Sequence, residues 1–149
     1  MSNQQHPART PSAEAFTRLI LETFRFNGQL LAAGDRLTKE FGLSSALWQV
    51  LGAVDEAPVS VAQIARNMGL TRQSVRRTAN VLMKRGFVTF EENPNHRRAK
   101  LVVPTDNGRD VLDRVTRVQI AWADRIAHGL SVKEIDSAVR MVQRLCERL

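Results

Sequence analysis

Residues 60–86 read SVAQIARNMGLTRQSVRRTANVLMKRG and contain two helical patterns separated by a glycine. Ser60, with a glutamine three residues later, is typical of a capping box at a helix start. Gly69 ends that short helix, Thr71 is placed to cap the next one, and Gly86 ends the second. Two helices joined by so short a turn predict a helix-turn-helix, with an ordinary helical hairpin as the alternative.

The second of these helices has an apolar side and a basic side. At about 100° per residue, the apolar side consists of Val75, Ala79 and Leu82. The opposite side carries Gln73, Arg77, Asn80 and Lys84, with Arg76 beside it. Residues 72–85 contain no Asp or Glu, although a solvated basic stripe usually has acids at i±4. Because uncompensated cations repel one another, we expect this face to bind a polyanion.

After the second helix the pattern changes to β-rich segments. Residues 87–90 and 101–103 are predicted strands, and an Asn-Pro turn signal and several basic residues lie between them. A two-stranded hairpin that follows a helix-turn-helix is a winged helix. Its wing can lie beside the minor groove of DNA while the second helix occupies the major groove.

Further helices are expected on both sides of this region. Apolar residues at helical spacing predict a long helix from Ser12 to about Phe41, and Ser44 is placed to cap a short one. After the hairpin, a helix capped by Thr105 and a final helix opened by a second capping box, Ser131 with Glu134, are predicted.

The predicted fold is mainly α with a small β-hairpin wing, a winged helix-turn-helix flanked by N- and C-terminal dimerisation helices. Four segments are expected along the chain. They are a flexible N-terminal arm (1–11), a dimerisation helix (12–42), the winged helix-turn-helix (43–104) and C-terminal dimerisation helices (105–149).

Charge is concentrated in one part of this 149-residue chain, whose formal net charge is +7. Residues 66–100 hold nine Lys and Arg but only two acids, so this segment accounts for the whole net charge. Localised charge favours a polyanionic partner, with double-stranded DNA first and an anionic membrane surface or a protein second. A single cysteine, no signal peptide and no apolar run long enough to span a bilayer predict a cytoplasmic protein.

No pattern of catalytic or metal-binding residues is present in the sequence. The three histidines are scattered, and there is no phosphate-binding glycine loop or nucleophile motif. Asp110 and Asp113 each precede an arginine by four residues, which predicts ion pairs rather than paired catalytic carboxylates. Cys146 lies in the apolar stripe of the last helix and is interpreted as a small core residue. We expect no enzyme, cofactor or metal site.

From Leu47 to Gly108 the chain resembles the MarR (multiple antibiotic resistance regulator) family of transcription factors. The matching segments are SVAQIARNMGL from Ser60, TRQSVRRT from Thr71, LMKRG from Leu82, the hairpin NPNHRRAKLV from Asn93, and the spacing of Thr105 and Gly108. Two positions depart from the usual pattern, because His96 stands where the family's wing commonly has an acid and Pro104 where it has a leucine.

The resemblance implies a homodimer that binds palindromic operator DNA and represses genes. It assigns six residues of the second helix to the major groove: Thr71, Arg72, Gln73, Ser74, Arg76 and Arg77. It assigns the wing residues Arg97 or Arg98 to the minor groove. A non-specific architectural DNA-binding protein and a basic protein- or membrane-interaction module remain the alternatives.

Many family members release DNA when a small aromatic acid binds between the dimer helices and the winged helix. Phe24, Trp48 and Trp122 are candidates for lining such an effector pocket, with ordinary core packing as the other interpretation. Family members that sense oxidation carry a reactive cysteine in the first helix, so Cys146 does not inherit that role.

Overall fold

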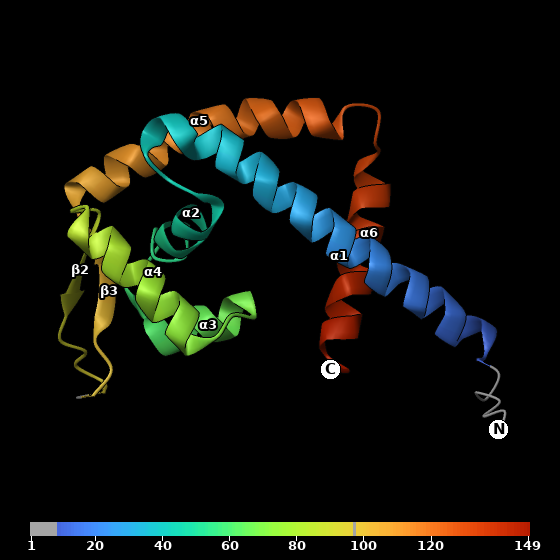
Figure 1. Ribbon diagram of the computed structural model, residues 1–149, viewed down its shortest axis with the longest axis horizontal. Coiled ribbons are helices and arrows are strands. Elements are labelled where there is room, and N and C mark those ends of the chain that lie inside the picture. Colours follow the sequence, from blue (N-terminus) through green and yellow to red (C-terminus); the bar gives the residue numbers. More distant parts are fainter. Residues whose placement is uncertain (1–8, 97) are drawn as a thin grey trace, which may run out of the picture. The chain divides into compact units, whose positions relative to one another are not determined.

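The computed structural model describes residues 9–96 and 98–149, so Arg97 and most of the predicted N-terminal arm lie outside the described residues. Contacts divide the chain into two compact units, a first that extends to Val115 and a second, Thr116–Leu149. The first unit contains the helix-turn-helix and the hairpin (Figure 1). The predicted mainly helical winged fold is therefore confirmed.

The first helix, α1 (Pro11–Thr38), begins where Thr10 accepts a hydrogen bond from the backbone N–H of Ala13. It continues through a 3₁₀ turn, η1 (Lys39–Phe41), to Gly42, so the α-helix ends three residues earlier than predicted. The second helix, α2 (Ser45–Gly52), starts at Ser44 as expected.

Two close contacts hold α1 against α2. The hydroxyl of Ser45 donates to the carbonyl of Leu31 at 2.5 Å, and the backbone N–H of Ser45 donates to Asp35 at 2.7 Å. Gly34 faces Ser45 at a separation that leaves no room for a Cβ atom. Gly34 is therefore needed for the close packing of α1 against α2.

The helix-turn-helix consists of α3 (Val61–Met68) and α4 (Arg72–Lys84). Ser60 accepts from the N–H of Gln63, and Thr71 accepts from the N–H of Ser74. The reciprocal half of the predicted first capping box is wrong, because the amide of Gln63 bonds to side chains one turn further along α3. The orientation of α4 is then fixed by the burial of its apolar side, because Val75, Ala79 and Leu82 are fully buried.

The sheet has three strands, where the sequence predicted two. Strands β2 (Val88–Glu91) and β3 (Leu101–Pro104) form the expected hairpin, which lies beside α4 (Figure 1). A two-residue strand, β1 (Val59–Ser60), pairs with the other edge of β3, giving the antiparallel order β1-β3-β2. The sheet thus ties the start of α3 to the wing.

A continuous core joins these elements in the first unit. It is built from the buried apolar residues Leu43, Leu47, Val50, Leu51, Val54, Val61, Ile64, Ala65, Val75, Ala79, Leu82, Val88, Val102, Val111, Leu112 and Val115. The last three come from the start of α5 (Asp106–Ala127). The winged helix therefore packs against the first turns of the helix that leaves it.

The second unit contains the end of α5 and all of α6 (Val132–Cys146). Ser131 and Glu134 form the predicted capping box, and the hydrogen bonds from Ser131 lower the pKa of the Glu134 carboxyl. Cys146 is exposed, so its interpretation as a core residue is wrong for the single chain. Helical spacing places Cys146 on an apolar stripe, but it does not show whether that stripe is covered.

Replacing Gly108 by alanine should lower the free energy of unfolding by about 1–3 kcal/mol, the usual cost of overpacking. A Cβ atom there would collide with the backbone carbonyl of Phe87, which cannot rotate away as a side chain would. Gly52→Ala is the matched control, because a Cβ atom there would meet no atom within 4 Å apart from neighbouring backbone of its own helix. Urea denaturation should show the control at least as stable as the wild type, and equal effects of the two substitutions would contradict this account.

Candidate nucleic-acid interface

The side of α4 that faces away from the core is polar, basic and exposed. All six residues that the family resemblance assigns to the major groove are exposed, and they lie between the cap and the first turns of α4. Thr71 uses its hydroxyl to cap the helix. The burial of Val75 and Ala79 therefore leaves one face of α4 for a partner.

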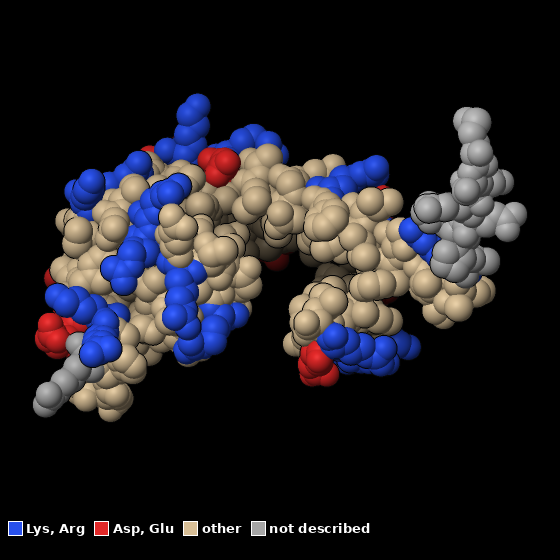
Figure 2. Space-filling model, turned by 60° about the horizontal axis from the view of Figure 1, so that its bottom comes forward, with Lys and Arg blue, Asp and Glu red and all other residues tan. Residues whose placement is uncertain are grey.

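The charge on this face is uncompensated in the structure as well as in the sequence. The described residues form three ion pairs, Arg25–Glu22, Lys100–Glu92 and Arg114–Asp110, and none of them includes a residue of α4. Figure 2 shows basic side chains gathered over the part of the molecule that carries the helix-turn-helix and hairpin, with few acidic ones among them. Asp110 forms its predicted ion pair, whereas Asp113 does not pair with Arg117 among the described residues.

A hollow of about 990 Å³ lies between the helix-turn-helix and the hairpin. Its cationic lining residues are Arg66 from α3, Arg72 and Arg76 from α4, and Arg98 and Lys100 from the wing. Arg77 does not line it, although it is the next residue after Arg76. The two neighbouring arginines thus differ in position, with Arg76 towards the wing and Arg77 away from the hollow. Arg66 and Lys100, which lie outside α4, are further candidates for contacting a polyanion.

The tip of the wing is shaped by short-range hydrogen bonds. Asn95 donates its backbone N–H to the side chain of Asn93 at 3.0 Å, and His96 donates its N–H to the carbonyl of Asn93 at 3.1 Å. The side chains of His96 and Arg98 are exposed and line the hollow. Arg97, the other predicted wing residue, lies outside the described residues.

The three aromatic residues proposed for an effector pocket have different surroundings. Phe24 on α1 is 70% exposed. Trp48 on α2 is half-buried and lines a separate hollow of about 460 Å³ together with Met68, Gln49 and other residues of α2 and α3. Trp122 is half-buried on the part of α5 in the second unit. Phe24 does not contribute to the hollow at Trp48.

Within residues 9–96 and 98–149, no group of three or more His, Cys, Asp or Glu side chains is placed to hold a metal ion. The helices in this described part also lack any span with the length and apolar character required to cross a bilayer.

A helix-turn-helix whose exposed basic second helix lies beside a basic hairpin is the arrangement found in winged-helix DNA-binding domains. The profile described as MarR family matches residues 41–99. The chain is 34% identical over 137 residues to an uncharacterised protein of Mycobacterium tuberculosis, covering 89% of this chain and 96% of that one. It is also 23% identical to the transcriptional activatory protein BadR of Rhodopseudomonas palustris, over 91% of this chain and 81% of BadR.

Among solved structures, CouR from Rhodococcus jostii RHA1 bound to p-coumaroyl-CoA superposes with a TM-score of 0.75 at 25% identity, covering 81% of this chain and 86% of CouR. This protein therefore belongs to the MarR family of winged-helix transcriptional regulators. The resemblance inferred from the sequence motifs is confirmed.

Proposed function

We propose that this protein is a homodimeric repressor that binds a palindromic operator through α4 and the wing, and that a small aromatic ligand releases it. The observation that carries the proposal is the exposed face of α4, whose cations have no ion-pair partner among the described acids. We also propose a cytoplasmic location, because operator DNA lies in the cytoplasm of bacteria such as those that contain the relatives described above.

The geometry of α4 and the wing suits the two grooves of B-DNA. The major groove is about 12 Å wide and accepts a helix, so α4 can place Gln73 and Arg77 against base edges. The hollow beside Arg76 then faces the sugar-phosphate backbone between the grooves, and Arg98 reaches the phosphates or the minor groove beyond it. On this arrangement Arg77 reads bases, while Arg76 and Arg98 hold the backbone.

Exposed apolar side chains support dimerisation through the terminal helices. On α1 they include Phe16, Ile20 and Phe24, and on α6 they include Ile135, Val139 and Val142. Soluble monomers rarely leave such helix faces uncovered. A second copy of the chain offers matching faces, and the resulting two-fold symmetry explains why a palindrome would be bound, with half-sites one helical turn apart.

The proposed effector is a small aromatic compound, bound at or near Trp48. This residue lines a hollow with Met68, Gln49 and Asn67, so an aromatic ring there would meet apolar side chains and amide groups. The crystal structure of CouR contains bound p-coumaroyl-CoA, an aromatic thioester, which makes aromatic acyl compounds the first class of ligand to test.

Selection from random duplexes should yield a palindromic sequence bound at least about 10³-fold more tightly than a scrambled duplex of the same length. Titration by fluorescence anisotropy measures both affinities at one salt concentration. Equal affinities would favour the architectural DNA-binding alternative. Binding to anionic vesicles but to neither duplex would favour the membrane-surface alternative.

Val139→Glu should shift the protein from dimer to monomer at micromolar concentration, because it places a charge in the proposed interface. Arg144→Glu, on the opposite side of α6, is the matched control and should leave the dimer intact. Sedimentation velocity distinguishes the two forms. A wild-type protein that sediments as a well-folded monomer would overturn the proposed assembly.

Arg77→Ala should cost about 1–3 kcal/mol of binding to the selected operator and relax the preference at one base position per half-site. Arg98→Ala should weaken binding to all duplexes alike and reduce the salt slope by about one unit per subunit. Arg76→Ala is expected to behave as Arg98→Ala, because both residues line the hollow. Repeating the duplex selection with each variant tests the assignment, which fails if Arg77→Ala leaves every base preference unchanged.

A further inference from the structure

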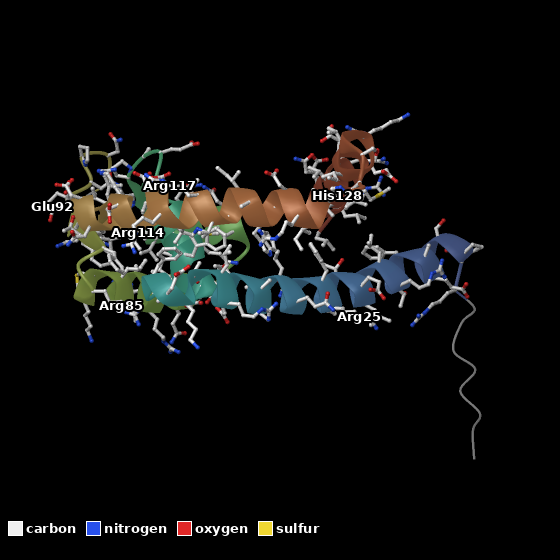
Figure 3. All side chains as sticks on the ribbon, turned by 90° about the horizontal axis from the view of Figure 1, so that it is seen from above. Arg25, Arg85, Glu92, Arg114, Arg117 and His128 are labelled. Carbon is white, nitrogen blue, oxygen red and sulfur yellow. The ribbon has the colours of Figure 1, made fainter. Side chains whose placement is uncertain are left out.

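The two side-chain hydrogen bonds with the longest separation along the described chain meet at the C-terminal end of α4. A guanidinium N–H of Arg85 donates to the carbonyl of Gly42, 43 residues earlier. The hydroxyl of Thr105 donates to the carbonyl of Gly86 at 2.6 Å, 19 residues earlier. Figure 3 shows Arg85 where the end of α4 lies beside the end of α1. We call these contacts the α4 junction.

Both acceptors in the α4 junction are glycines at which a helical segment ends. Gly42 and Gly86 have φ values of 71° and 75°, in the left-handed region where a helix commonly stops. Carbonyl groups at a helix end lack partners within the helix and lie at the negative end of its dipole. A guanidinium and a hydroxyl are therefore suitable donors for them.

Thr105 connects the α4 junction to the start of α5. Its hydroxyl accepts the backbone N–H of Gly108 at 3.1 Å, and its own N–H donates to the carbonyl of Phe87 at 3.0 Å. One threonine thus caps α5 and binds the chain that leaves α4. The helix before the winged helix and the helix after it are both attached to the same end of α4.

We propose that Arg85 and Thr105 are positioning residues, which set the angle of α4 relative to α1 and α5 and thereby determine how well α4 reads bases. This inference rests on the proposed function, in which the terminal helices hold the dimer together and α4 enters the major groove. Hydrogen bonds to base edges form only within narrow ranges of distance and angle, whereas contacts to phosphates tolerate a displacement of the helix. Loss of the α4 junction should therefore reduce specific binding and leave non-specific binding unchanged.

The competing role for Arg85 is a phosphate contact, since it is exposed and lies among the basic residues. A phosphate contact would contribute equally to all duplexes and to the salt slope. Lys84 provides a control of the same charge, because it is an exposed neighbour on the basic face of α4 with no ion-pair partner among the described residues. A phosphate contact from Lys84 would affect all duplexes alike and leave the ratio of specific to non-specific affinity unchanged. Arg85→Met and Lys84→Met remove the same charge, and only the first removes the bond to Gly42.

The experiment compares affinities of the full-length variants for the selected operator and for a scrambled duplex, at several salt concentrations. Arg85→Met should lower the ratio of specific to non-specific affinity on the order of tenfold relative to Lys84→Met, with equal salt slopes for the two variants. Equal ratios for the two variants, or a salt slope lower only for Arg85→Met, would overturn the inference. Circular dichroism confirms that each variant is folded at the temperature of binding.

Substitutions of Thr105 test the inference independently of Arg85, and one of them keeps the hydroxyl group. Thr105→Ser keeps the hydroxyl and should retain the wild-type ratio, whereas Thr105→Val keeps the shape, loses both hydroxyl bonds and should lower it. A folded Thr105→Val variant with the wild-type ratio would overturn the inference. A wild-type protein that does not distinguish operator from scrambled DNA would instead refute the proposed function itself, so the two failures are distinguishable.

Discussion

The burial of one side of α4 is the constraint on which the rest of the structure depends. Val75, Ala79 and Leu82 are fully buried, so the rotation of α4 about its axis is fixed by the core and not by its charges. The polar residues on the opposite side of the helix are then left exposed. The same packing against α2 and α3 decides which arginines are available to a partner, because 100° per residue separates neighbouring side chains.

Local chemistry was the part of this fold that the sequence could predict. Ser44, Thr71 and Ser131 begin helices where expected, because a capping side chain bonds to backbone groups two or three residues away. The hairpin was also predictable from its β-rich segments and turn signal. β1 was missed because two residues carry no periodicity, and its strand exists only through pairing with Leu101 and Val102.

The candidate site likewise has features that the sequence predicts and features that it does not. The basic face of α4 follows from helical spacing alone, whereas the different positions of Arg76 and Arg77 depend on which side the hairpin folds to. The bond from Arg85 to Gly42 was not predictable either, because no local pattern relates residues 43 positions apart. The exposed position of Cys146 illustrates a further limit, since periodicity identifies an apolar stripe without showing what covers it.

The lack of acids in α4 has a consequence for the order in which the protein folds. Arg72 and Arg76 are like charges at i,i+4, which destabilises an isolated helix by about 0.2–0.5 kcal/mol per pair. The isolated segment is therefore expected to have low helix content until its apolar side packs against α2 and α3. Folding should then nucleate elsewhere in the chain. Bound polyanion removes that repulsion. A polyanion that binds the folded helix therefore also stabilises α4 against local unfolding.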